Sequence, residues 1–472
     1  MASKCMILLA LLVPLLNAQT FNQPGYPGFG LGARFGGGQV VPQQDLQAQE
    51  DIRVPSAPRQ RNGGQSRNPA PTAPTRAPVI PKTSFMDRFS SKLYAKIAPA
   101  QAGSNFVYSP VSVHSILALI YGTSFGKTRR ELKSAGEFVD DQIDVAMIFE
   151  KLIKFRSDLG NVELKMATKL YHNQLKGGAY PGFPEFSQFY FNTADEAVDM
   201  TRAKDTSEKI NFWVSDSTDG KIRNLAAPSD ITEQTEALLV NAIYFKGRWE
   251  NEFATMDTQP SNFKHSDGRI SSVAMMYNDD VYSLADIPEL GASALGLNYR
   301  DSNISMLILL PKQVNGLRAL EAQLADPQFD LNRIAARLQR QNVLVRLPKF
   351  RIEFDQDMTQ PLKQMDVQEM FGPKSQIKTM LNDRVRVEKI LQKAFIDVNE
   401  AGTEAAAASY AKFVPLSLPA KSPEFTADHP FVFAIRTPTS VLFIGHVEHP
   451  TPLTASPEGA GRGRQRSFSS RQ

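Results

Sequence analysis

The sequence predicts a mixed α+β domain, because helical patterns gather early in its folded region and strand patterns dominate later. Four apolar residues recur at every fourth position, which indicates an amphipathic helix. They are Phe85, Phe89, Leu93 and Ile97. The segment Val111–Tyr121 is apolar nearly all round and predicts a buried helix. The strand-like runs are Val162–Tyr171, Ala237–Phe245, Ser305–Leu310, Asn342–Lys349, Ala394–Val398, Phe431–Arg436 and Val441–Val447.

The two ends of the chain differ in composition from this folded region. Residues 1–18 combine Lys4 with an apolar run and end in Ala18, which is typical of a secretory signal peptide. Residues 19–82 are rich in Gly, Pro, Gln and Arg, and residues 451–472 form a basic tail. Neither segment can bury enough apolar surface to fold, so we expect both to be disordered. The folded domain is expected over residues 83–450.

Composition excludes several classes of protein. The only cysteine, Cys5, lies in the predicted signal peptide, so the mature chain would have no disulfide and no thiolate metal site. The net charge of +4 is mild and gives no reason to expect nucleic acid as a partner. The apolar run near the N-terminus is too short to span a bilayer comfortably, and no other run is longer. We therefore expect a secreted, extracellular protein that is a monomer and is not bound to a membrane.

No motif of an enzyme is present. The six histidines show no metal-binding spacing such as H-E-x-x-H, and the chain has neither a G-x-S-x-G elbow nor a phosphate-binding loop. The six histidines are His114, His172, His265, His429, His446 and His449. We expect no catalytic residue, no metal and no cofactor.

The segment Glu400–Lys412 is the most informative part of the sequence. Its four consecutive alanines favour a helix, but Gly402 offers a hinge and Pro415 and Pro419 favour extended backbone downstream. With a period of two, one face is small and nearly apolar: Thr403, Ala405, Ala407, Ser409 and Ala411. The other face carries Glu404, Ala406, Ala408, Tyr410 and Lys412. This pattern suits a segment that is exposed in one state and a strand over a core in another.

Several ordered motifs across most of the chain resemble those of the serpins, a family of serine protease inhibitors. They are "NFVYSPVSV" at Asn105–Val113, "VNAIYFKGRWENEF" at Val240–Phe253, "SMLILLP" at Ser305–Pro311, "VNEAGTEAAAAS" at Val398–Ser409, "FTADHPFVFAI" at Phe425–Ile435 and "FIGHVEHP" at Phe443–Pro450. The resemblance implies three β-sheets, about nine helices and an exposed reactive-centre loop. It also implies an inhibitor that traps an extracellular serine protease covalently when the cut loop inserts into a sheet.

The resemblance also places the reactive bond. Counted from Thr403, the anchoring residue is Leu416 and the bond is Leu416–Ser417, which suits a chymotrypsin-like or elastase-like protease. The alternative is Lys412–Phe413, which suits a trypsin-like protease but leaves a shorter segment to insert. The implied hinge comprises Glu400, Gly402, Thr403, Glu404, Ala405, Ala406, Ala407 and Ala408.

Other matched positions are expected to control where the sheet opens. The resemblance places a polar cluster beneath the sheet, formed by Ser109, Ser112 and Asn241, and Trp249 near the start of the loop. Gln392 occupies the position where many serpins have a histidine. Ordinary packing and hydrogen bonding could equally explain these residues.

Two further features concern partners and modification. Basic residues cluster in two places and suggest weak binding to a polyanion, although such runs are usually solvated helix faces. The clusters are Lys127, Arg129, Arg130 and Lys133, and Lys151, Lys154 and Arg156. Asn303-Ile-Ser305 is the only glycosylation triplet and makes Asn303 the candidate for a glycan.

Resemblance to insect haemolymph serpins implies a protease partner in an innate-immune cascade that leads to Toll activation or melanisation. The competing interpretation is a non-inhibitory serpin that acts as a carrier, chaperone or storage protein. Such relatives tend to have bulky, charged or proline residues in the hinge, whereas the run after Glu404 contains alanines.

Overall fold

The computed structural model describes residues 84–154, 160–326, 330–403 and 422–452, which all belong to one compact unit. Its helices are α2 Phe85–Ile97, α3 Pro110–Thr123, α4 Gly126–Gly136, α5 Gln142–Lys154, α6 Phe183–Phe191, α7 Ala203–Ser217, α8 Leu317–Leu324, α9 Leu331–Ala335 and α10 Thr359–Lys363. Its strands are β1 Phe106–Tyr108, β2 Glu163–Asn173, β3 Thr193–Val198, β4 Ala237–Arg248, β5 Gln259–Lys264, β6 Ile270–Ile287, β7 Ala292–Asn298, β8 Ser305–Pro311, β9 Gln339–Pro348, β10 Phe350–Asp357, β11 Lys389–Asn399, β12 Gly402–Thr403, β13 Glu424–Thr426, β14 Phe431–Arg436 and β15 Val441–Val447. The predicted α+β class is confirmed.

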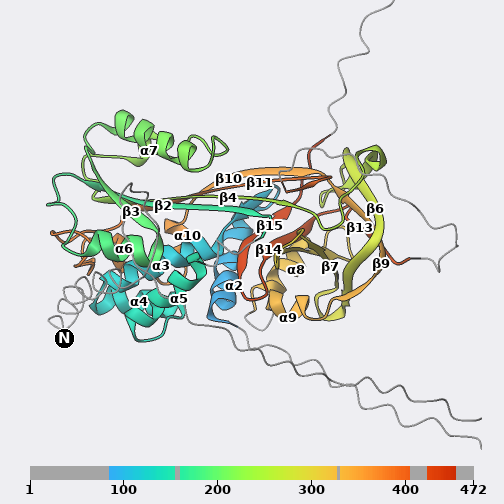
Figure 1. Ribbon diagram of the computed structural model, residues 1–472, viewed down its shortest axis with the longest axis horizontal. Coiled ribbons are helices and arrows are strands. Elements are labelled where there is room, and N and C mark those ends of the chain that lie inside the picture. Colours follow the sequence, from blue (N-terminus) through green and yellow to red (C-terminus); the bar gives the residue numbers. More distant parts are fainter. Residues whose placement is uncertain (1–83, 155–159, 327–329, 404–421, 453–472) are drawn as a thin grey trace, which may run out of the picture. The chain divides into compact units, whose positions relative to one another are not determined.

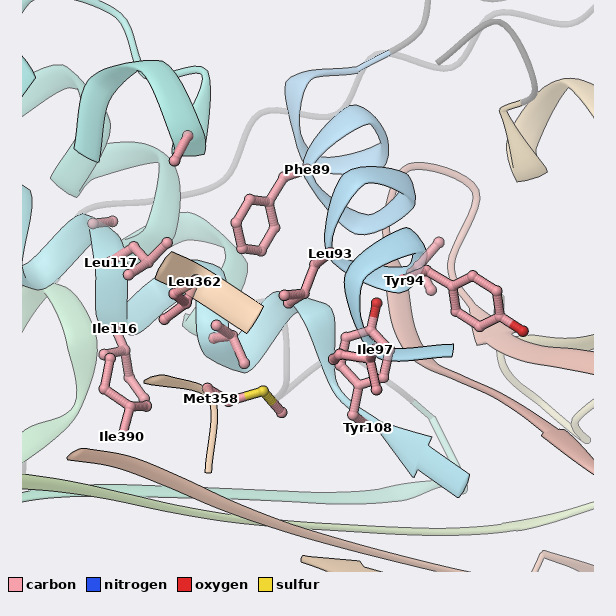
Figure 2. Close-up of a cluster of buried hydrophobic side chains, with 14 of the residues drawn as sticks. Phe89, Leu93, Tyr94, Ile97, Tyr108, Ile116, Leu117, Met358, Leu362 and Ile390 are labelled. Atoms are coloured by element: carbon pink, nitrogen blue, oxygen red, sulfur yellow. The ribbon is translucent and has the colours of Figure 1, made fainter. Parts of the chain in front are cut away.

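The two helices predicted from the sequence form the middle of the core. The Ser84 hydroxyl accepts a hydrogen bond from the backbone of Asp87 and caps α2. The four-residue spacing then turns one face of α2 inward, and Figure 2 shows Phe89, Leu93 and Ile97 close to side chains of α3 and α10. All of α3 is buried, as its continuous apolar sequence predicts.

A six-stranded sheet carries the region of functional interest. Its order is β10-β11-β12-β4-β2-β3, and β11 also pairs directly with β4. Helix α7 covers one face of this sheet through a cluster that includes Ile210, Val214, Val240 and Leu391 (Figure 1). The opposite face lies on the main core, which contains Leu239 and Ile390 of the sheet together with side chains of α3. A long segment could enter this sheet only between two layers of side chains.

The remaining strands form one nine-stranded sheet in place of the two additional sheets that were expected. Strand β6 explains the difference, because it is 18 residues long. Its first part pairs with β5, its last five residues pair with β7, and β9 pairs along its middle. The two predicted sheets therefore share β6 and are counted as one by their hydrogen bonds.

Each predicted strand run coincides with a strand of the structure, from β2 to β15, except that Val162 lies just before β2 and Lys349 just after β9. The long strand β6, which alternates polar and apolar residues irregularly, and the edge strand β10 were not predicted, although Phe350–Asp355 of β10 does alternate. The predicted signal peptide, extension and basic tail lie outside the described residues. Among those that are described, no helix is long and apolar enough to cross a membrane.

Candidate functional site

The hinge of the predicted loop begins where β11 ends. Residues 400 and 401 form a turn, and Gly402–Thr403 then form the short strand β12. Residues 404–421 lie outside the described part of the chain, so the rest of the predicted hinge and both candidate reactive bonds are not described. These residues are Glu404, Ala405, Ala406, Ala407 and Ala408, then Lys412, Phe413, Leu416 and Ser417.

Strand β12 lies between β11 and β4 at one end of the six-stranded sheet. Thr403 is the Cα partner of Val398 on one side and of Gly247 on the other, and its side chain is fully buried. Gly402 has φ +154°, and a Cβ there would collide with the carbonyl oxygen of Gly247, so only glycine fits. Gly402 and Thr403 of the hinge are therefore already part of the sheet in the uncut chain.

Trp249 holds the turn that precedes β12. Its indole Nε1 donates to the carbonyl oxygen of Asn399 at 3.0 Å, and its backbone N–H donates to that of Ala401 at 3.0 Å. The backbone N–H of Phe253 donates to the carbonyl oxygen of Glu400 at 2.9 Å. Trp249 is thus beside the hinge, where the sequence placed it, and it contacts the backbone of the turn.

The Glu400 side chain anchors the same turn to two other elements. Its carboxylate accepts hydrogen bonds from the Thr258 hydroxyl at 2.9 Å and from Lys349 Nζ at 3.1 Å. Burial opposes ionisation of Glu400, but the hydrogen bonds from Lys349 and Thr258 outweigh it and hold the pKa below its usual value. At neutral pH the turn is therefore fixed by a charged, partly buried clamp.

Tyr299 completes the hinge site and was missed by the sequence analysis. Its hydroxyl lies 2.7 Å from Thr403 Oγ1, and its ring stacks on Trp249 with centroids 4.6 Å apart. Gly247 leaves room for the ring, since a Cβ there would lie 2.7 Å from Tyr299 Cδ1. Because 104 residues separate Tyr299 from Thr403, no local pattern in the sequence pairs them.

The predicted polar cluster forms in the same sheet, farther along the β11–β4 gap from the hinge. Gln392 on β11 donates from Nε2 to Asn241 Oδ1 on β4 at 3.0 Å, and its Oε1 accepts from the backbone of Ser109 at 2.8 Å. The Ser109 hydroxyl in turn donates to that of Ser112 at 3.0 Å. Asn241 Nδ2 also donates to the Thr168 hydroxyl at 2.9 Å, a partner that the sequence analysis missed. The cluster joins β11, β4, β2 and the start of α3.

Below the hinge, β11 and β4 pair directly. Seven parallel register pairs run from Lys389↔Leu238 to Phe395↔Tyr244, and the Gln392↔Asn241 pair lies at their middle. The two strands separate only beyond Phe395, where β12 begins to fill the space. The hinge thus occupies the open end of a gap whose remainder is closed.

Three of the four basic residues of the first cluster have partners. Lys127 Nζ forms ion pairs with Glu369 at 2.7 Å and Glu131 at 3.4 Å, and Lys133 pairs with Asp140. Arg129 donates to the carbonyl oxygen of Asp140 at 2.6 Å. In the second cluster, Lys154 pairs with Glu150, and Arg156 lies outside the described residues. Much of the positive charge is therefore compensated locally.

Asn303 lies in the turn before β8 and is exposed. It lies two residues before the apolar strand, and its exposure leaves the side chain accessible to a modifying enzyme. The structure describes no group of three or more His, Cys, Asp or Glu side chains that could hold a metal ion among residues 84–452 outside the gaps.

Comparison with known proteins agrees with this geometry. The model of the family described as "Serpin (serine protease inhibitor)" matches residues 84–450. Alaserpin of Manduca sexta is 34% identical over 77% of this chain and 93% of its own length, and the leukocyte elastase inhibitor of Sus scrofa is 34% identical over 77% and 98%. Serpin48 of Tenebrio molitor superposes with a TM-score of 0.71 at 29% identity, over 78% of this chain and 97% of that structure.

The chain therefore belongs to the serpin family, and the predicted serpin fold is confirmed. Several of its relatives, including the leukocyte elastase inhibitor of Sus scrofa, are named as protease inhibitors, which supports a serine protease as its partner and inhibition as its activity.

Proposed function

We propose that this protein is a secreted, single-use inhibitor of serine proteases, which traps the enzyme when its cut loop inserts between β11 and β4. The observation that carries this proposal is the position of Thr403, already between the two strands and paired with both. Both strands run in the orientation that an antiparallel inserted strand requires, because β11 and β4 are parallel to each other.

Continuing the register of β12 along the gap gives each loop residue a partner on either side. Glu404 would lie opposite Lys246, and Ser409 would lie opposite both Gln392 and Asn241. The face of Thr403 would bring only small side chains against the core that contains Ile243, Ile396 and Val398. On this core-facing side, the small polar Ser409 thus coincides with the one polar rung, formed by Gln392 and Asn241.

The chemistry follows from the protease's own mechanism. Its serine Oγ attacks the carbonyl carbon of Leu416, the peptide bond to Ser417 breaks, and the amine of Ser417 leaves with a proton. The N-terminal part of the loop, now free at Leu416 and esterified to the protease, can insert. A net gain of ~1 kcal/mol per inserted residue would total on the order of 10 kcal/mol. Distorting an oxyanion hole takes less, since one donor is worth about 3–4 kcal/mol.

The register favours Leu416 over Lys412 as the anchoring residue. Continued to the far end of the gap, residue 412 would lie opposite Lys389 and Leu238, the last pair of the β11–β4 ladder. Cleavage after Lys412 would place the acyl bond inside the sheet, whereas cleavage after Leu416 leaves four residues beyond it. The segment from Thr403 to Leu416 spans roughly 46 Å when extended.

The same argument assigns roles to the polar cluster and Trp249. Breaking the Gln392–Asn241 hydrogen bond is necessary for insertion, so we propose that Gln392, Asn241, Ser109 and Ser112 set the resistance of the closed gap. Trp249 sets the direction in which the hinge enters.

Leu416 supports chymotrypsin-like or elastase-like specificity, in line with a relative named as an elastase inhibitor. The long N-terminal extension and the Leu416–Ser417 bond resemble those of the insect immune serpin Necrotic. We therefore propose action in insect haemolymph on a protease of the Toll or melanisation cascade, as a monomer that carries a glycan at Asn303.

The test mixes the purified protein with chymotrypsin, elastase and trypsin and resolves the products on a denaturing gel. We expect an adduct of high mass with chymotrypsin or elastase and a released C-terminal peptide that begins at Ser417. A peptide that begins at Phe413 would move the reactive bond to Lys412. Cleavage without any adduct would refute inhibition by trapping.

A further inference from the structure

Among the described residues, the side chain of Thr403 has one hydrogen-bond partner, and that partner lies outside the six-stranded sheet. Thr403 Oγ1 lies 2.7 Å from the hydroxyl of Tyr299, which follows directly on β7. We propose that Tyr299 is a positioning residue of the trapping reaction, whose hydroxyl keeps Thr403 seated so that insertion starts from a rung already formed. This inference rests on the proposed function and adds to it the residue that prepares the hinge.

Tyr299 is held rigidly enough to act as a fixed point. Its ring stacks on Trp249 at 4.6 Å and meets the ring of Phe245 edge-on at 4.8 Å. Its backbone N–H donates to Ile304 at 3.0 Å, and the residue is 1% exposed. Burial raises the pKa of the Tyr299 phenol well above its usual value, so the hydroxyl keeps its proton at every physiological pH.

The Tyr299 hydroxyl assists the ordering of the first hinge residues, which is otherwise the least favourable step of insertion. Ordering the first hinge residues costs conformational entropy before a ladder has formed to offset it. The backbone contacts of Trp249 and Phe253 fix the turn at residues 399–401 but do not touch the Thr403 side chain. Within the part of the chain that the structure describes, the Tyr299 hydroxyl alone links that side chain to a fixed part of the fold by a hydrogen bond.

A geometric consequence separates this role from general packing. Thr403 keeps the same partners on β11 and β4 if the remainder of the loop inserts below it, so the Tyr299–Thr403 bond would persist in the inserted state. The bond therefore does not have to break during the reaction, in contrast to the Gln392–Asn241 bond. Its loss should hinder insertion, whereas loss of a bond that closes the gap should ease it.

The test compares Tyr299→Phe and Thr403→Val, which keep the buried volumes and remove one hydroxyl each. We expect amide exchange of residues 402 and 403 in the uncut protein to become about five- to tenfold faster in either variant, the change that one buried hydrogen bond produces. More inhibitor should be consumed per protease molecule, by about twofold or more. The double variant should show no larger effect on exchange and inhibitor consumption than the more impaired of the two single variants, since both changes remove the same bond.

Tyr108→Phe is the matched control. Tyr108 is equally buried and its hydroxyl also makes a single hydrogen bond, to Ser90, in the core shown in Figure 2. It should lower the melting temperature without altering hinge exchange or the consumption ratio. The inference is overturned if Tyr299→Phe matches the wild type in hinge amide exchange and in inhibitor consumed per protease molecule. It is also overturned if the effects of the two single changes add fully in the double variant.

Failure of the proposed function would look different. If the wild type is cleaved without forming an adduct, trapping is refuted and the positioning role falls with it, even if exchange responds to Tyr299→Phe. If the adduct forms normally in both wild type and Tyr299→Phe, only the inference about Tyr299 falls.

Discussion

The two ends of the gap between β11 and β4 are built in opposite ways. At the hinge end the strands are apart, and Gly402 and Thr403 already fill the space with their own ladder pairs. At the lower end the strands pair with each other over seven register pairs, and Gln392 bridges to Asn241. Insertion therefore has a prepared beginning and a resistant continuation, and the balance between them should decide whether the molecule inhibits or is simply cut.

The largest effect is expected from blocking the continuation of the inserted strand. Proline in Ala407→Pro has no N–H for the ladder, and Thr403→Arg would bury a charge in the hinge. Each variant should turn the inhibitor into a substrate, with adduct yield reduced at least tenfold and cleavage by chymotrypsin retained. The yield is measured on a denaturing gel; an unchanged yield in either variant contradicts insertion.

Weakening the closed end should act in the opposite direction. Asn241→Ala leaves the buried Gln392 amide without its partner across the gap, which should lower the free energy of unfolding by roughly 1–3 kcal/mol. The uncut protein should also lose activity faster on warming, as its loop inserts without cleavage. Gln356→Ala is the control, because Gln356 lies opposite Gln392 on β10 but bonds to a backbone oxygen outside the gap. Equal behaviour of the two variants would remove the proposed role of the bridge.

The clamp at the hinge end gives a pH dependence. The folded pKa of Glu400 is depressed, so its stabilising contribution is present above the unfolded value of about 4.5 and is lost as pH falls through the folded pKa. Glu400→Gln should destabilise the hinge by about 1 kcal/mol at pH 7. The difference in hinge amide exchange between wild type and Glu400→Gln should shrink towards pH 3. A difference that stays constant over this range would mean that charge plays no part in the clamp.

Asp87 lies far from the gap between β11 and β4, so changing it should alter stability without affecting inhibition. Burial raises the pKa of Asp87, at the start of α2, to about 6. Its folded pKa exceeds the unfolded value, so the contribution of Asp87 to stability is greatest below pH 4 and falls as pH rises through 6. Asp87→Asn should remove this fall and stabilise the protein by roughly 1–3 kcal/mol at pH 7, seen by denaturant titration. Adduct yield should not change; a change would mean that the hinge responds to global stability.

The sequence was informative where structure depends on local pattern or on a motif. The spacing of Phe89, Leu93 and Ile97 predicted α2, and the resemblance placed Trp249, Asn241 and Gln392, whose contacts the structure describes. Tyr299 and Thr168 were missed because each meets its partner only through the folding together of distant parts of the chain. The union of two expected sheets was also missed, since nothing local indicates that β6 continues through both.

The most direct measurement compares the melting temperature of the intact protein with that of protein cut at Leu416–Ser417. An insertion that contributes on the order of 10 kcal/mol should raise the melting temperature of the cut form by roughly 10 °C or more for a domain of this size. Equal melting temperatures would show that cleavage releases no stored stability, and the trap described here could not operate.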